Sequence, residues 1–287
     1  MQERIPSRFG LLNMVRTPDP MDDSVTLYIH GIGGSWATWT PLIREAIAQG
    51  QPLQDSIFVD LPGFGRSENL LGNLDLAEVG EALLSMVMGL GSKHIRLVGH
   101  SMGGFLALDM LSRRHAQLLS GVVFGGAFIS LLRAFQRPTT LLQNRPGTLL
   151  LFAELLSLSY SGSLGKRTLA VLHRTGQLPR LMNGLFAYPR LVPINLLGAI
   201  VASSGNSAFK LAARNAEAYD AAETFNRIDA PTHLYFGQYD RLVPPTDARF
   251  LTDLSKAVEL GIVKGVGHFA HLERPDLVLA YIRKNAI

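Results

Sequence analysis

Six short apolar runs recur along the chain, and each one ends at glycine or at polar residues. They begin at about residues 25, 56, 94, 118, 231 and 257. Polar and apolar positions alternate little within these runs, which is typical of strands that are buried on both faces. Helical patterns lie between them, at about residues 39–49, 74–89, 103–115, 245–255 and 275–284. This alternation predicts an α/β protein with a mostly parallel sheet and helices on both faces.

The alternation of strands and helices stops between about residues 128 and 224. Leu, Ala and Arg dominate this stretch, and Gly and Pro mark its turns. We interpret it as a helical cap, residues 130–218, inserted into a core made of residues 1–129 and 219–287. A chain of 287 residues is long enough for one large core with such an insertion.

The predicted cap is basic, whereas the predicted core is acidic. Residues 131–214 carry ten Lys and Arg but a single acid, Glu154, which gives this segment a net charge of +9. The whole chain has a net charge of only +4. A basic surface would attract an anionic lipid surface or an acidic carrier protein. Nucleic-acid binding is not expected, because no recognised motif accompanies the charge.

The composition excludes several kinds of site. The chain contains no cysteine, so disulfides, thiolate catalysis and Cys-ligated zinc are ruled out. The most lipophilic stretches, residues 149–158 and 191–202, are shorter than the ~20 apolar residues that a membrane span needs. The first ten residues carry charges of both signs and no apolar run, unlike a signal peptide. We therefore expect a soluble, cytoplasmic protein that does not span a membrane.

A serine lies between glycines where a predicted strand meets a predicted helix. The stretch Gly99-His100-Ser101-Met102-Gly103 fits the G-x-S-x-G nucleophile elbow. Such a sharp turn needs neighbours without bulk, and it lifts the serine hydroxyl above the strand end. The motif also occurs by chance in ordinary turns, but a strand before it and a helix after it favour Ser101 as a nucleophile.

A serine nucleophile needs a base, and five histidines follow Ser101 along the chain. His268 directly follows the last predicted strand, where the ligand groups of open parallel sheets gather. We therefore favour His268, with His271 as its nearest rival. Structural roles suit the other three, which are His115, His173 and His233.

The base in turn needs an acid that orients its ring and stabilises its charged form. Asp240 also follows a predicted strand, and a loop comes after it. The ordinary role of an aspartate at such a place is a turn or a helix cap. Asp247 is a rival, but it reads as part of the first turn of a helix. We favour Asp240.

Backbone N–H groups are the expected stabilisers of a developing oxyanion. The Met102 amide opens the elbow helix, and the glycine-rich run after the first strong strand offers the Ile32 amide. This run fits neither the dinucleotide fingerprint nor the Walker pattern, so phosphate binding is not expected. The sequence predicts no metal ion and no organic cofactor.

Four patches resemble the α/β-hydrolase family in their order and spacing. They are "HGIGGS" at 30–35, "DLPGFGRS" at 60–67, "GHSMGG" at 99–104, and "GQYDRLVP" at 237–244 with "GVGHFAHLERPD" at 265–276. The resemblance implies about eight strands, a cap inserted after the sixth, and a triad of Ser101, Asp240 and His268. Family members that cleave epoxides or carbon–halogen bonds carry aspartate at the elbow, so the serine here argues against those branches.

These features predict a serine hydrolase that cleaves a carboxylic ester through an acyl-enzyme. The apolar clusters of the cap indicate a hydrophobic substrate of small to medium size. A thioester, a lactone and a carbon–carbon bond in a vinylogous diketone are alternatives, because the same triad would serve them. A non-catalytic small-molecule receptor is the alternative outside enzymes, since a fold does not dictate a function.

Overall fold

The structure is a computed structural model. It describes residues 1–17, 23–127, 219–243 and 245–285, together with short pieces at 167, 171–172, 174–177, 185–188 and 192. Apart from these pieces, the predicted cap over 130–218 lies outside the described residues, and its boundaries stay a prediction.

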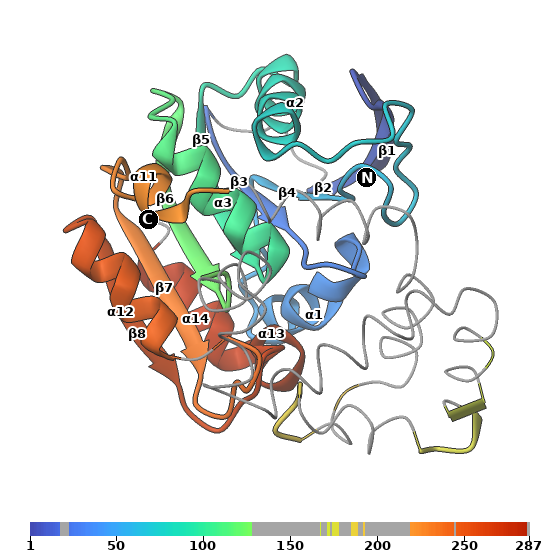
Figure 1. Cartoon of the computed structure of the whole chain (residues 1–287). Coiled ribbons are helices and arrows are strands. Elements are labelled where there is room, and N and C mark those ends of the chain that lie inside the picture. Colours follow the sequence, from blue (N-terminus) through green and yellow to red (C-terminus); the bar gives the residue numbers. More distant parts are fainter. Residues whose placement is uncertain are drawn as a thin grey trace.

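Eight strands form one sheet in the order β1-β2-β4-β3-β5-β6-β7-β8 (Figure 1). The strands are β1 Gln2–Ser7, β2 Gly10–Arg16, β3 Ser24–Ile29, β4 Ser56–Val59, β5 His94–His100, β6 Leu118–Phe124, β7 Thr232–Gly237 and β8 Val258–Val263. β2 runs antiparallel to both of its neighbours, β1 and β4, and all other neighbouring strands are parallel. The predicted fold class is confirmed.

The hydrophobic pattern identified six of the eight strands and missed the first two, although the family resemblance implied about eight. β1 lies at the edge of the sheet, and its side chains are alternately exposed and half-buried. An edge strand buries little apolar surface, so its hydrophobic signal is weak. Pro6 weakens the strand pattern further.

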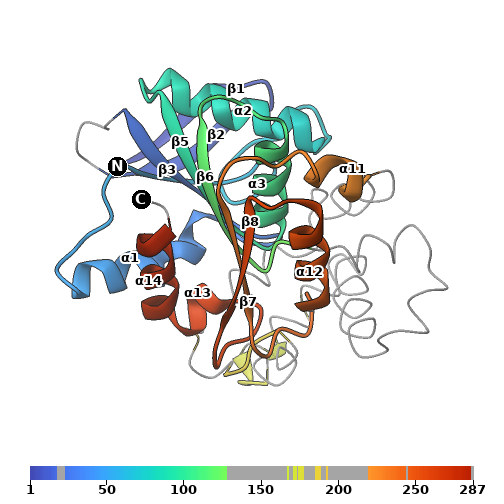
Figure 2. The same ribbon diagram turned by 90° about the vertical axis from the view of Figure 1, so that its left-hand side faces the viewer.

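Helices cover both faces of the sheet, as predicted (Figure 2). One face carries α1 Thr40–Ala48, α13 Ala270–Glu273 and α14 Pro275–Asn285. The other carries α2 Leu76–Gly89, α3 Met102–Ser112, α11 Ala221–Phe225 and α12 Pro245–Leu254. None of these helices, nor any other described helix, is both long and apolar enough to cross a bilayer.

A hydrophobic core lies on each side of the sheet, and β3 contributes to both. Leu27 and Ile29 pack into the core on the α2 and α3 side, whereas Tyr28 joins Trp39 in the core on the α1 and α14 side. All four side chains are at most 1% exposed. Burial of a large apolar side chain contributes about 1.5–3 kcal/mol, so a strand that is buried on both faces is fixed firmly in register.

Candidate active site

Ser101 occupies a strained turn between β5 and α3. Its backbone has φ 55° and ψ −126°, a conformation that residues other than glycine rarely adopt. Such a conformation costs on the order of 1–3 kcal/mol and persists only where the surroundings impose it. Here the Ser101 N–H donates to the Phe124 carbonyl of β6 at 2.9 Å, which ties the turn to the neighbouring strand.

The glycines around Ser101 are required by close approach of the backbone. A Cβ at Gly99 would lie 2.6 Å from the Gly103 carbonyl oxygen. A Cβ at Gly103 would collide with the carbonyl oxygens of Ile29 and His30 at the end of β3. The G-x-S-x-G pattern therefore follows from packing α3 directly onto the sheet, which fixes the position of the serine.

Ser101, His268 and Asp240 form one hydrogen-bonded chain. His268 Nε2 lies 2.9 Å from Ser101 Oγ, and His268 Nδ1 lies 2.8 Å from Asp240 Oδ2. Their exposed fractions are 3%, 2% and 7%, in that order. Asp240 follows β7 and His268 follows β8, so the three residues meet where the carboxyl ends of parallel strands converge.

The second oxygen of Asp240 is held by the backbone of its own loop. Oδ1 accepts hydrogen bonds from the N–H groups of Leu242 and Val243, both at 2.9 Å. Oδ2 is thereby left facing His268. Because a carboxylate only accepts, Nδ1 of the imidazole carries the proton and Nε2 is the acceptor that faces Ser101. Asp247, the rival acid, lies in the first turn of α12.

His271, the rival base, lies behind the chain of hydrogen bonds instead of within it. It is fully buried, and neither of its ring nitrogens has a partner among the described residues. Its ring lies 4.7 Å from that of Trp39 and 4.3 Å from that of His100. Burial, followed by the proximity of His268, lowers the pKa of His271 to about 3. His271 is therefore neutral at physiological pH.

Two of the remaining candidate histidines pair with glutamates away from Ser101. His115 Nε2 lies 3.3 Å from Glu81, and His233 Nδ1 lies 3.4 Å from Glu259. His173 lies outside the described residues. Within the described part of the chain, no group of three or more His, Asp or Glu side chains could hold a metal ion.

The loop after β3 passes directly beside Ser101. A Cβ at Gly31 would lie 2.8 Å from Ser101 Cβ, and the Gly34 N–H donates to the Gly31 carbonyl at 3.0 Å to close a turn around Ile32. Met102 begins α3 on the other side of the serine. No described residue accepts a hydrogen bond from the backbone N–H of Ile32 or Met102. Both amides are thus close to the serine, as an oxyanion hole requires.

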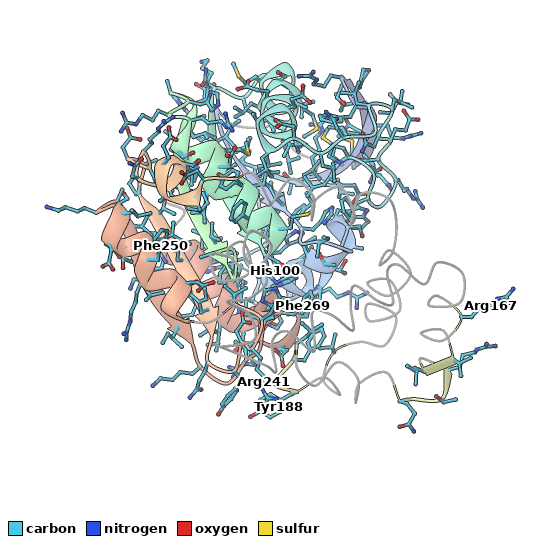
Figure 3. All side chains as sticks on the ribbon, in the orientation of Figure 1. His100, Arg167, Tyr188, Arg241, Phe250 and Phe269 are labelled. Carbon is cyan, nitrogen blue, oxygen red and sulfur yellow. The ribbon has the colours of Figure 1, made fainter. Side chains whose placement is uncertain are left out.

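His100 is a site residue that the sequence analysis did not identify. Its Nε2 lies 3.1 Å from the His268 carbonyl oxygen, and its ring packs against Phe269 at 4.9 Å (Figure 3). Burial, and then the neighbouring His271 and His268, lower the pKa of His100 well below its usual range. The neutral ring therefore donates from Nε2 to the backbone of the base. The sequence feature that could have indicated His100 is its position directly before Ser101 in the elbow.

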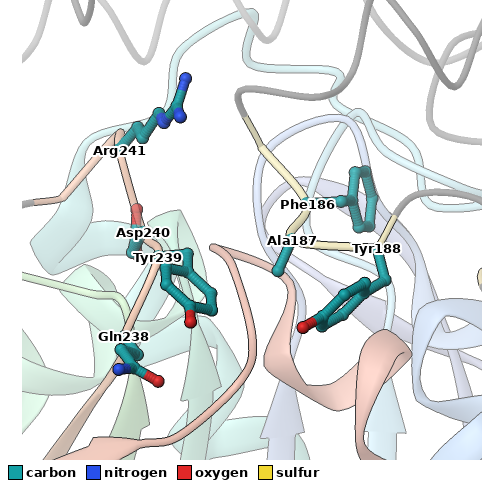
Figure 4. A pocket seen from close by; sticks show the side chains of 7 residues that line it. All are labelled: Phe186, Ala187, Tyr188, Gln238, Tyr239, Asp240 and Arg241. Atoms are coloured by element: carbon teal, nitrogen blue, oxygen red, sulfur yellow. The ribbon is translucent and has the colours of Figure 1, made fainter.

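A pocket of about 470 Å³ opens beside Asp240. Tyr239 and Tyr188 lie on opposite sides of it, and Arg241 lies at its edge (Figure 4). The complete lining is Phe186, Ala187, Tyr188, Gln238, Tyr239, Asp240 and Arg241. Aromatic and polar groups are therefore mixed at this opening.

Comparison with known proteins gives one family. The family described as "alpha/beta hydrolase fold" matches residues 26–275. Among curated proteins, a 2-hydroxy-6-oxononadienedioate/2-hydroxy-6-oxononatrienedioate hydrolase of Burkholderia vietnamiensis is 25% identical over 277 residues. That alignment covers 89% of this chain and 86% of the relative.

Solved structures share the fold at lower identity. A 2-hydroxy-6-oxo-6-phenylhexa-2,4-dienoate hydrolase from Rhodococcus sp. strain RHA1 superposes with a TM-score of 0.72 at 20% identity, covering 100% of this chain and 98% of its own. A thermophilic esterase from Thermogutta terrifontis gives a TM-score of 0.70 at 17% identity, with 99% and 97% covered. At these identities the likeness concerns the fold.

Proposed function

Because the chain belongs to the alpha/beta hydrolase fold family, we propose that it is a serine hydrolase that cleaves carboxylic esters of hydrophobic substrates through an acyl-enzyme. The observation that carries the proposal is the chain of hydrogen bonds from Ser101 Oγ through His268 to Asp240, at 2.9 and 2.8 Å. A serine hydroxyl is a weak nucleophile alone, and this arrangement supplies the base and its orienting acid.

In the first half of the reaction, His268 Nε2 takes the Ser101 proton while Oγ attacks the carbonyl carbon of the ester. The carbonyl oxygen becomes an oxyanion, which the N–H groups of Met102 and Ile32 stabilise. Asp240 balances the positive charge that forms on the imidazole. The imidazolium then gives its proton to the departing alkoxide, which leaves the acyl group on Ser101.

In the second half, water replaces the alcohol. His268 takes a proton from this water, which attacks the acyl carbon, and the oxyanion forms again in the same place. Its collapse breaks the bond to Ser101 Oγ, and the imidazolium returns a proton to the serine. The products are an acid and an alcohol, and no other reactant is consumed.

A hydrophobic acyl or alcohol group is the substrate feature that we propose. Residues 130–218 are rich in Leu and Ala, and the described part of this stretch brings Phe186 onto Phe269 at 4.7 Å, next to His268. Apolar walls of this kind favour apolar substrates. Attraction of the basic stretch to an anionic lipid surface or an acidic carrier protein remains a prediction about residues outside the described ones.

Turnover of p-nitrophenyl esters with graded acyl chains tests this proposal. We expect Ser101→Ala and His268→Ala to lose roughly 10⁴- to 10⁶-fold in kcat, because the triad acts as a unit. Ser112→Ala is the matched control, since this buried serine hydrogen-bonds within α3 to the Asp109 carbonyl at 2.7 Å. Esterase activity that survives in Ser101→Ala would contradict the proposal.

Carbon–carbon bond hydrolysis is the second candidate, favoured by the relatives. The substrate named for the Burkholderia vietnamiensis relative contains no ester or thioester, so its hydrolysis breaks a carbon–carbon bond. The same serine and base would serve that reaction. Comparing kcat/KM for a 2-hydroxy-6-oxo-dienoate with kcat/KM for the p-nitrophenyl esters separates the two candidates. A thioester and a lactone complete the panel of substrates. Preference for the dienoate by a hundredfold or more in kcat/KM would replace the ester as the proposed substrate.

A further inference from the structure

A segment far from the base in sequence lies against the loop that carries it. The His268 N–H donates to the Leu185 carbonyl at 2.7 Å. A Cβ at Gly267 would lie 2.6 Å from the same oxygen and 2.8 Å from the Ala187 nitrogen. The backbones of residues 185–188 and 267–268 are therefore in direct contact, which only glycine at position 267 permits.

Glu273 joins these two backbones through its carboxylate. Oε1 accepts from the Tyr188 N–H at 2.6 Å, and Oε2 accepts from the Gly267 N–H at 2.7 Å. The residue ends α13 and is 6% exposed. Burial raises the pKa of Glu273, and the hydrogen bonds from the backbone oppose that rise. Hydrogen bonds to a carboxylate are short and about twice as strong as those between neutral groups.

The partners of Glu273 are amides and not cations. Among the described residues, no Lys or Arg forms an ion pair with it. A buried carboxylate without a cation is costly, and here the backbone N–H groups of two separate segments compensate it. The arrangement serves to hold these segments at a fixed distance from one another.

Three backbone groups of Gly267 and His268 are consequently held by hydrogen bonds. The Gly267 N–H is bound by Glu273, the His268 N–H by the Leu185 carbonyl, and the His268 carbonyl by His100 Nε2. With its main chain fixed in this way, the side chain of His268 has one direction in which to reach Ser101. Only the bond from Glu273 is made by a carboxylate.

We propose that Glu273 is a positioning residue for the base: its carboxylate bridges the Gly267 and Tyr188 amides and so holds His268 Nε2 at Ser101 Oγ. This inference rests on the proposed function, in which His268 acts as the base. It assigns to the segment at 185–188 a part in the geometry of the site, because that segment is the other end of the bridge.

Two substitutions change the charge and the length of the Glu273 side chain one at a time. Glu273→Gln keeps the shape but presents an NH2 group to one of the two amides, which then has no acceptor. Glu273→Asp keeps the charge but is shorter by one methylene, so it cannot span both amides. We expect both variants to lose about 10- to 100-fold in kcat with KM within about twofold, because misplacement of a reacting group slows chemistry more than binding.

Glu259→Gln is the matched control, because its side chain is 76% exposed on β8. We expect it to keep the wild-type kcat. Labelling by a fluorophosphonate gives a second readout, in which the final stoichiometry counts folded sites and the rate reports activation of Ser101. For both Glu273 variants we expect slower labelling that reaches the wild-type stoichiometry.

The role of Glu273 would be overturned by a wild-type kcat in Glu273→Gln, by a wild-type kcat in Glu273→Asp, or by a kcat loss that matches a loss of labelled sites. The last would mean that the residue only maintains the fold. A rise in KM alone would also overturn it, by indicating a wall of the substrate pocket. If wild-type Ser101 itself is not labelled, the proposed function fails, and this inference fails with it.

Discussion

Two buried carboxylates hold the loops of the candidate site in different ways. Asp60, which is 1% exposed, follows β4 and binds three donors. Its Oδ1 accepts from the Trp36 N–H at 2.7 Å, and its Oδ2 accepts from Asn13 Nδ2 at 2.7 Å and the Arg66 N–H at 2.9 Å. Glu273 accepts from the Tyr188 and Gly267 N–H groups, and Tyr188 belongs to the stretch between β6 and β7.

The two carboxylates differ in which parts of the chain supply their donors. Asp60 fixes the loop that passes Ser101, and all of its donors come from the first 66 residues of the chain. Glu273 fixes the loop of His268, and it does so against Tyr188. Among the described residues, the loop that passes Ser101 is thus held by donors from the N-terminal part of the chain, whereas the loop of His268 is also held by a residue of the stretch between β6 and β7.

Substitution of Asp60 is expected to have the largest effect on stability. In Asp60→Asn, one of the three donors faces an NH2 group, and a buried donor without an acceptor costs about 1–3 kcal/mol. We expect the unfolding free energy in urea to fall by about 2–4 kcal/mol, since a charged acceptor is also lost. We also expect kcat to fall about tenfold, because the loop that carries Ile32 is loosened.

Asp220→Asn is the matched control for this change. Asp220 also accepts from two backbone N–H groups, those of Ala222 and Glu223, but it is exposed at the start of α11. Asn caps helices about as well as Asp, so we expect a change below about 0.5 kcal/mol. Equal losses in the two variants would show that burial of Asp60 contributes nothing.

His271 lies where the two sides of the site meet, between Trp39 and His100. Its pKa is about 3 in the folded protein against 6.5 as the ordinary value. The unfolded chain therefore takes up a proton below pH 6.5 that the folded chain refuses, so stability present at pH 7 is lost as the pH falls toward 3. By this linkage, we expect His271→Phe to remove about 2 kcal/mol of the destabilisation between pH 7 and pH 5.

Urea unfolding at both pH values measures this effect. His94→Gln is the control, because His94 is exposed at the start of β5, and we expect it to retain the wild-type loss. His30 and His100 are also buried with lowered pKa values, so part of the acid sensitivity remains in His271→Phe. An unchanged slope in His271→Phe would mean that His271 is protonated, or solvated, in the folded protein.

The smallest expected effect is the coupling between the two carboxylates. They share no partner, so the stability losses of Asp60→Asn and Glu273→Gln should add to within about 0.5 kcal/mol in the double variant. A double-mutant cycle in urea measures the difference. Coupling well above that value would show that the serine and histidine sides of the site form one cooperative unit.

The sequence predicted which residues lie together at the candidate site, because each of them follows a strand end. Ser101, Asp240 and His268 each come after an apolar run, and the carboxyl ends of parallel strands gather at one edge of the sheet. The six strands with continuous apolar runs were identifiable for the same reason, since burial on both faces leaves a strong signal. The edge strand β1 carries no such run.

The supporting groups could not be predicted, because their partners are distant in sequence. The bond from Tyr188 to Glu273 spans 85 residues, and the bond from His100 to His268 spans 168. Glu273 has the local pattern of an ordinary acid in a helical turn, and nothing in its neighbours indicates a contact with residue 188. Only the folded backbone brings such groups together, so the hydrophobic pattern and the residue spacing do not predict these contacts.

The most direct test of the central claim is covalent labelling of the wild-type protein with a fluorophosphonate, mapped by mass spectrometry. We expect a single adduct, located on Ser101, and we expect it to form at least about 100-fold more slowly in His268→Ala because the base is missing. Absence of an adduct on the folded protein, or an adduct on any other residue, would contradict the claim.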